Sequence, residues 1–78
     1  MSEPRSIDPP YLKVAAWLRN EIQSGRLKAG EQVPSANALA EQHDVSRNTA
    51  LRALKVIREE GLIVTQPGWG SFVAGDPR

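Results

Sequence analysis

Apolar residues recur at helical spacing in three stretches of the chain, over residues 10–24, 35–43 and 46–61. In each stretch they fall three or four positions apart, which is typical of a helix that packs one face on a core. The three helices are therefore expected to supply most of the core, through Tyr11, Val14, Ala15, Leu18, Ile22, Leu39, Ala40, Ala50, Ala53, Leu54 and Ile57.

Residues that favour helix ends delimit these stretches. Ser35 and Ser46 are predicted N-caps, because a serine hydroxyl can accept a backbone N–H of the first turn. Gly25 and Gly61 are predicted to end the first and third helices, because glycine enters the left-handed region without a Cβ clash. Only residues 44–45 separate the second helix from the third, which predicts a helix, a tight turn and a helix.

Two short apolar segments follow the third helix. Residues 62–65 and 71–73 are predicted strands joined by a turn over residues 66–70, and the hairpin is expected to add Leu62, Ile63, Phe72 and Val73 to the core. Val33 precedes a proline and should be extended, so it is expected to pair briefly with the hairpin as a third strand. The predicted fold is mainly α with a small antiparallel sheet: a winged helix-turn-helix of three helices plus a β-hairpin wing.

A length of 78 residues allows one domain. We place the domain at residues 11–75, with a proline-rich flexible arm at residues 1–10 and a frayed end at residues 76–78. The chain has no cysteine, which excludes disulfides and thiolate metal sites and is compatible with a cytoplasmic protein. No apolar run reaches the length of a signal sequence or a membrane span.

Charge is nearly balanced over the chain, at a net +1, but it is uneven on the third helix. Residues 47–58 contain four cationic residues and no acid, and Asn48, Arg52 and Lys55 lie opposite the apolar face. Such a face could be an ordinary solvated surface. Its place as the second helix of a helix-turn-helix favours contact with a duplex, because that motif inserts its second helix into the major groove.

The motifs, in this order and at this spacing, resemble the DNA-binding domain of GntR-type bacterial transcription regulators. The resemblance covers residues 11–73 and is carried by Tyr11, Val14, Leu18, Ile22, Leu39, Ala40, Ala53, Leu54 and residues 25–30, 33–35, 45–49, 60–63 and 68–73. It implies a repressor that binds operator DNA as a homodimer on an inverted repeat. The recognition helix 46–60 would enter the major groove, and the wing 66–71 would lie near the minor groove.

Residues that match the family's DNA contacts are implied to bind DNA here: Ser35, Ser46, Arg47, Asn48, Thr49, Gly68, Trp69 and Gly70. Two departures change the predicted contacts. Asn37 stands where the family often has an arginine, and it can bond a phosphate or a base edge without adding charge. Ala50 and Leu51 stand where valine and arginine are usual, so Leu51 is expected to touch a thymine methyl and Arg52 to contact a phosphate.

Individual roles follow from side-chain chemistry. Arg47 can donate two parallel hydrogen bonds to guanine O6 and N7, or else contact a phosphate. Asn48 could read adenine, and Thr49 could bond a phosphate or its own helix. A wing tip of glycines can approach DNA closely, so replacing Gly70 by valine is expected to weaken DNA binding more than it harms the fold.

Other functions are less well supported by the residues. No nucleophile–base pair, carboxylate cluster or phosphate-binding loop is visible, so neither an enzyme nor a cofactor is predicted. His43 is the only histidine, and no metal site is expected. GntR-type regulators generally carry a second, effector-binding domain, and none is expected within this chain. The alternative function is a winged-helix protein-interaction module, in which Leu51 and Trp17 would meet a protein. Trp17 could equally be an amphipathic ring that packs partly on its own domain, or a contact with a second subunit.

Overall fold

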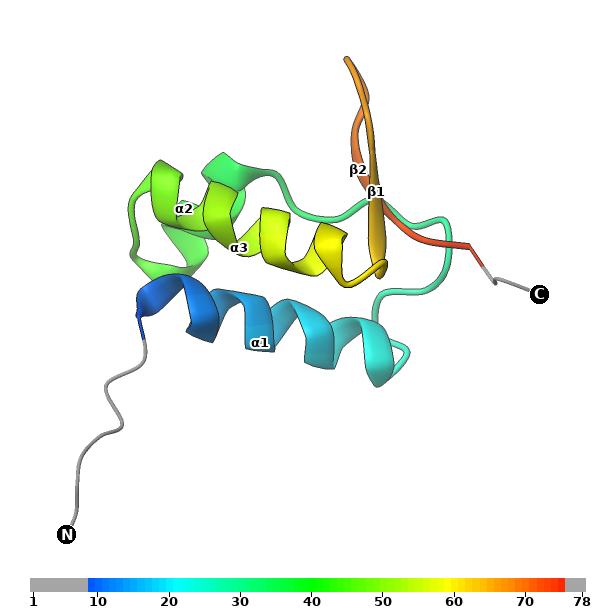
Figure 1. Cartoon of the computed structure of the whole chain (residues 1–78), viewed down its shortest axis with the longest axis horizontal. Helices are drawn as coiled ribbons and strands as arrows, with labels where there is room; N and C mark the ends of the chain where they lie inside the picture. Colours follow the sequence, from blue (N-terminus) through cyan, green and yellow to red (C-terminus); the bar gives the residue numbers. More distant parts are fainter. Residues whose placement is uncertain (1–8, 76–78) are drawn as a thin grey trace, which may run out of the picture.

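The computed structural model describes residues 9–75, so most of the expected N-terminal arm and all of the expected frayed end lie outside the described residues. Within this range the chain forms three helices and one hairpin, which confirms the predicted winged helix-turn-helix (Figure 1). The elements are α1 (Pro10–Gln23), α2 (Ala36–His43), α3 (Arg47–Glu59), β1 (Ile63–Gln66) and β2 (Gly70–Val73). In these residues no helix combines the length and the apolar character needed to cross a bilayer.

The helix ends lie where the capping residues predict them. The Oγ atoms of Ser35 and Ser46 accept the backbone N–H groups of Ala38 and Thr49, each at 3.1 Å. Gly61 follows α3 with a φ of 81°, and the N–H of Leu62 reaches back to the carbonyl of Ile57 at 3.2 Å. This pairing satisfies carbonyls that the last turn of a helix otherwise leaves free, and it stops α3 abruptly before the hairpin.

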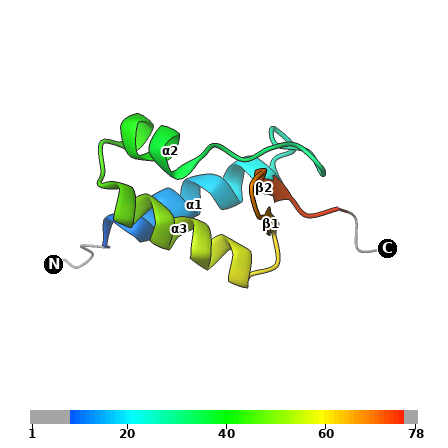
Figure 2. The ribbon, with the colours of Figure 1, turned by 90° about the horizontal axis from the view of Figure 1, so that it is seen from above.

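The turn between α2 and α3 depends on Asp44. It adopts the left-handed conformation, with φ 57° and ψ 49°, which aspartate tolerates better than most residues. The next N–H, of Val45, donates to the carbonyl of Ala40 at 3.0 Å. The chain therefore reverses within two residues, and α3 leaves α2 at a fixed angle (Figure 2).

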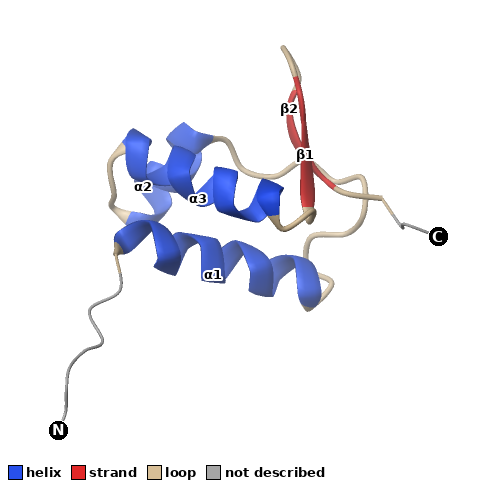
Figure 3. Ribbon diagram, in the orientation of Figure 1, coloured by secondary structure: helices blue, strands red, loops and turns tan. Residues whose placement is uncertain are grey.

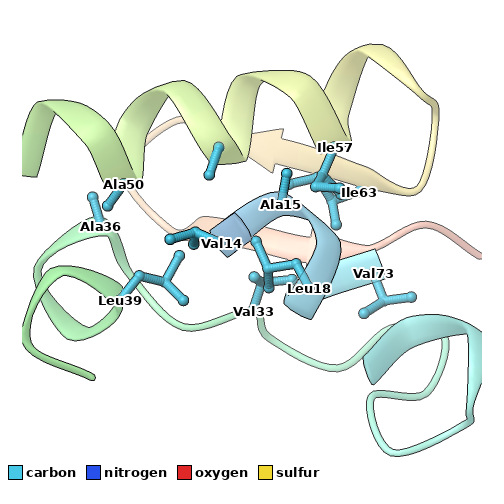
Figure 4. Close-up of a cluster of buried hydrophobic side chains, with 11 residues drawn as sticks. Val14, Ala15, Leu18, Val33, Ala36, Leu39, Ala50, Ile57, Ile63 and Val73 are labelled. Atoms are coloured by element: carbon cyan, nitrogen blue, oxygen red, sulfur yellow. The ribbon is translucent and has the colours of Figure 1, made fainter. Parts of the chain in front are cut away.

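The core lies where the three helices meet the base of the hairpin. Helices α1 and α3 run side by side (Figures 1 and 2). Ala15, Ala50 and Ala53 are fully buried in the core that forms there. Figure 4 shows larger side chains filling the space around these small residues. The buried set is Val14, Ala15, Leu18, Val33, Ala36, Leu39, Ala50, Ala53, Ile57, Ile63 and Val73.

One predicted core residue of the hairpin is misplaced. Ile63 pairs with Val73, and both are buried, whereas Val64 pairs with Phe72 on the opposite face. Val64 is 44% exposed and Phe72 is half-buried outside the core cluster. Successive strand residues point to opposite faces, so adjacent residues of β2 cannot both enter the core. The prediction that Phe72 is a core residue was therefore wrong.

The connector between α1 and α2 passes the base of the hairpin (Figure 3) and pairs with β2, as the extended conformation of Val33 predicted. Gln32 forms a single antiparallel bridge with Phe72. On either side of it, the N–H of Val33 donates to Ser71 and the N–H of Val73 donates to Glu31, each at 2.8 Å. β2 thus lies between β1 and the connector and is hydrogen-bonded to both.

An ion pair joins α1 to the end of α3. Arg19 donates from Nε and Nη2 to the two carboxylate oxygens of Glu60, with the Nε bond at 2.8 Å. These hydrogen bonds and the positive charge of Arg19 hold the pKa of the Glu60 carboxyl below its ordinary value of 4.5. About a third of each side chain is exposed, so solvent screens the pair and its contribution to stability is small.

We expect Glu60→Gln to lower the free energy of unfolding by up to about 1 kcal/mol at neutral pH. A carboxyl with a depressed pKa in the folded state stabilises the fold above its ordinary pKa. That contribution is lost as the pH falls through the depressed value. The difference between wild type and variant in urea unfolding should therefore shrink in acid. Glu59→Gln is the matched control, since Glu59 forms no ion pair within residues 9–75. Equal effects of the two substitutions at all pH values would contradict the assigned pair.

Candidate nucleic-acid interface

The first turn of α3 presents polar side chains to solvent on a capped helix end. Arg47 and Asn48 are exposed, while Thr49 is half-buried. The Ser46 hydroxyl accepts the N–H of Thr49 and donates to its Oγ1 at 2.9 Å. Ser46 and Thr49 therefore fix each other, and Arg47 and Asn48 project from a rigid turn.

Asn37, from the first turn of α2, lies beside Arg47. Its Oδ1 accepts a hydrogen bond from Arg47 Nε at 3.0 Å. Both side chains are exposed, and neither forms another side-chain hydrogen bond or an ion pair within residues 9–75. The structure thus brings together two predicted site residues that are ten positions apart in the sequence.

The second turn of α3 continues the exposed surface. Leu51 is 40% exposed, and Arg52 lies next to it. The guanidinium carbon of Arg52 is 4.3 Å from the centre of the Tyr11 ring, in a cation–π contact between α3 and the start of α1. Tyr11 was predicted only as a core residue. The sequence carries no local signal for this contact, because 41 positions separate the two residues.

The wing tip holds a single large side chain between two glycines. Gly68 and Gly70 have φ values of 80° and 116°, and Trp69 is 75% exposed. The Trp69 carbonyl accepts a hydrogen bond from Nε2 of Gln32 at 3.0 Å, and its N–H donates to Gln66 at 2.9 Å. The backbone of the tip is therefore held in place, and the hairpin extends well beyond the three helices (Figure 1).

Gly70 has a structural role that the sequence did not reveal. A Cβ at this position would lie 2.7 Å from Nε2 of Gln32, and the backbone is in a region that side chains rarely adopt. Gly70→Val would therefore strain the backbone and displace the Gln32 amide, so its effect on DNA binding could not be separated from its effect on the fold. That it weakens DNA binding more than it harms the fold stays a prediction. Trp69, whose side chain is mostly solvated, is the better position at which to change the tip without disturbing the sheet.

Trp17 packs within its own domain. It is half-buried, and its ring meets His43 of α2 edge to face, at 5.0 Å between centroids and 71° between planes. This contact supports the interpretation of Trp17 as an amphipathic packing residue. Within residues 9–75 no three His, Asp or Glu side chains gather as metal ligands would.

The fold is a winged helix-turn-helix, and α3, the second helix of that motif, has an exposed polar N-terminal end. Residues 10–73 match the family model described as "Bacterial regulatory proteins, gntR family". The chain belongs to this family, as the motifs from Tyr11 to Val73 suggested.

Named relatives and solved structures agree with this membership. The chain is 40% identical over 73 residues to the histidine utilization repressor of Klebsiella aerogenes, and 33% identical over 65 residues to the HTH-type transcriptional regulator GgaR of Escherichia coli K12. These alignments cover 92% and 83% of the chain, which spans only 30% and 26% of the two relatives.

Two solved structures share the fold closely. A transcriptional regulator from Oenococcus oeni superposes with a TM-score of 0.86 at 32% identity, over 97% of this chain and 62% of that one. AraR(DBD), crystallised in complex with operator ORX1, superposes with a TM-score of 0.84 at 30% identity, over 95% of this chain and 92% of that one.

Proposed function

We propose that this domain binds a specific double-stranded operator sequence and represses transcription, with the first two turns of α3 in the major groove. The observation that carries the proposal is the division of α3 into two faces. Ala50, Ala53 and Ile57 are completely buried, whereas Arg47, Asn48, Leu51 and Arg52 are exposed on the other side. A helix so divided can enter a groove without unpacking the domain.

The exposed side chains suit a duplex chemically. Arg47 and Asn48 can donate to base edges, and Leu51 offers an apolar surface to a thymine methyl. Arg52 and the hydroxyls of Ser46 and Thr49 are expected to contact phosphates. Ser35 and Asn37 carry this polar surface onto the start of α2, whose free N–H groups favour anions. The solved complex of AraR(DBD) with an operator and the relatives named as repressors support the same proposal.

Selection of binding sites from random duplex oligonucleotides tests whether the domain binds a specific sequence. Arg47→Ala tests whether the first turn of α3 contacts the DNA. We expect an enriched motif, and a loss of about 1–3 kcal/mol in binding to it when Arg47 is truncated. Thermal unfolding should be unchanged, because Arg47 is exposed and its one side-chain hydrogen bond within residues 9–75 goes to another exposed side chain.

Two results would contradict the proposal. A protein that enriches no sequence is not a specific DNA-binding domain. The second result is binding that depends little on salt. It would indicate a protein-interaction module, the competing function, which would bind its partner through exposed apolar residues such as Leu51 and Trp69. Binding to DNA should weaken steeply as salt is raised, because cationic contacts release counterions from the phosphates.

The wing gives the next prediction. We infer that the tip at residues 68–70 lies against the minor groove or its phosphates, with Trp69 as the contacting side chain. Trp69→Ala should weaken operator binding about fivefold or more, since stacking or wedge contacts of aromatic side chains contribute about 1–3 kcal/mol. Val64→Ala, on the same hairpin but away from the tip, is the control. Unchanged affinity of the Trp69 variant, with no protection beside the major-groove site in a footprint, would leave the wing a purely structural role.

Assembly gives the third prediction. A single module of this kind buries about 600–1,000 Å² against DNA, and dimeric helix-turn-helix proteins place two recognition helices about one turn apart. Within residues 9–75 the large exposed apolar side chains of this domain come from three separate parts of the fold, α1, α3 and the hairpin, and so offer no single apolar surface for a partner. They are Leu12, Leu51, Val64 and Trp69. We therefore propose that the 78-residue chain is at most a weak dimer in solution and that two copies load cooperatively on an inverted repeat.

Native mass measurements with a full palindrome and an isolated half-site check the assembly. We expect a two-to-one complex on the palindrome, with tighter binding of each copy than on the half-site. Equal affinity and one-to-one stoichiometry on both duplexes would rule out the dimer. A tight dimer in the absence of DNA would contradict the loading route while leaving operator binding intact.

A further inference from the structure

The hydrogen bond between Asn37 and Arg47 uses one particular donor of the arginine. Nε donates to the Asn37 Oδ1, and the two Nη atoms form no hydrogen bond or ion pair within residues 9–75. A guanidinium carries five N–H donors in a fixed plane, so four donors remain, all at its far end. The bond therefore leaves free the pair of nitrogens that can meet two acceptors at once.

The same bond restrains the arginine before any ligand arrives. An arginine side chain has many rotamers, and a hydrogen bond to its Nε favours those that hold the guanidinium beside Asn37. Guanine presents O6 and N7 side by side in the major groove, and a restrained pair of Nη donors matches them. A base pair without guanine at this position should therefore be bound more weakly, because Arg47 can reach another acceptor only by breaking its hydrogen bond to Asn37.

We propose that Asn37 is a positioning residue for base recognition: its Oδ1 orients Arg47 so that the two Nη atoms read one guanine of the operator. This inference rests on the proposed DNA-binding function and adds to it separate roles for Asn37 and Arg47. Asn37 sets how strictly one base pair is read, and Arg47 makes the contact.

The inference differs from direct recognition by Asn37 in a measurable way. A direct phosphate contact by Asn37 would raise affinity for every sequence alike. Positioning of Arg47 would act on a single base pair and would vanish when Arg47 is absent. The preference for guanine at one position, rather than affinity alone, is therefore the quantity to follow.

The experiment uses the full 78-residue chain and the operator motif enriched by selection. Equilibrium competition is measured with the consensus duplex and with single base-pair changes at each position, for wild type, Asn37→Ala, Asn37→Asp, Arg47→Ala and the double variant Asn37→Ala/Arg47→Ala. Gln42→Ala is the matched control, because Gln42 is an exposed amide of α2 with no side-chain hydrogen bond within residues 9–75. Thermal unfolding of each variant checks that the fold is retained.

Wild type should prefer guanine at one position by about tenfold or more. Asn37→Ala should lose most of that preference while keeping the other base preferences, and Gln42→Ala should keep all of them. Asn37→Asp retains an acceptor for Nε, so it should keep the guanine preference while binding every sequence more weakly, because it adds a negative charge. The double variant should show the same base preference at this position as Arg47→Ala, since Asn37 is expected to act on this base pair only through Arg47.

Two outcomes would overturn the inference and leave the proposed function standing. One is a uniform loss of affinity in Asn37→Ala with an unchanged guanine preference, which would make Asn37 a phosphate contact. The other is an effect of Asn37→Ala on the guanine preference that persists in the Arg47→Ala background, which would make Asn37 a base contact of its own. Failure to enrich any motif would instead overturn the proposed function, and this inference with it.

Discussion

The structure depends on the burial of one face of α3. Ala50, Ala53 and Ile57 are completely buried, and α3 packs against both α1 and α2. Small residues at the contact let α1 approach closely, so a chain with few aromatic residues can still close a core. Every exposed residue of α3 is oriented by this contact, because a helix with one face fixed cannot rotate about its own axis. The position of the candidate interface is thus a consequence of core packing.

The sequence predicted those features that depend on local chemistry. Serine caps, glycine stops and helical periodicity placed all three helices to within a residue or two, and the turn at Asp44 followed from their spacing. The face of each hairpin residue was harder to predict, because a strand of four residues contains both buried and exposed apolar side chains. Phe72 was placed in the core for this reason, although its neighbour Val73 is the residue that enters it.

The candidate site was predicted as a set of residues but not as an arrangement. Its residues come from α2, α3 and the wing, and the contacts that orient them join distant positions: Asn37 to Arg47, Tyr11 to Arg52, and Gln32 to Trp69. No pattern in one segment can reveal such contacts, since they arise only when the helices have packed. The sequence thus indicated which residues face outwards, and the structure adds that several are already held by a partner. Restraint of this kind reduces the entropy lost on binding.

The attachment of β2 also has a mechanical consequence. The residues at its end and just after it are held from both sides: Gly30 donates to the carbonyl of Val73 at 3.0 Å, Val73 donates to Glu31 at 2.8 Å, and Ala74 donates to Leu62 at 2.8 Å. Tension applied to the chain beyond Ala74 is therefore shared by two neighbouring segments and does not peel the hairpin open from one edge. The load passes through these hydrogen bonds to Leu62, which follows α3, and to the connector that precedes α2. A pull at one point of the backbone thus reaches the segments that adjoin both helices of the helix-turn-helix.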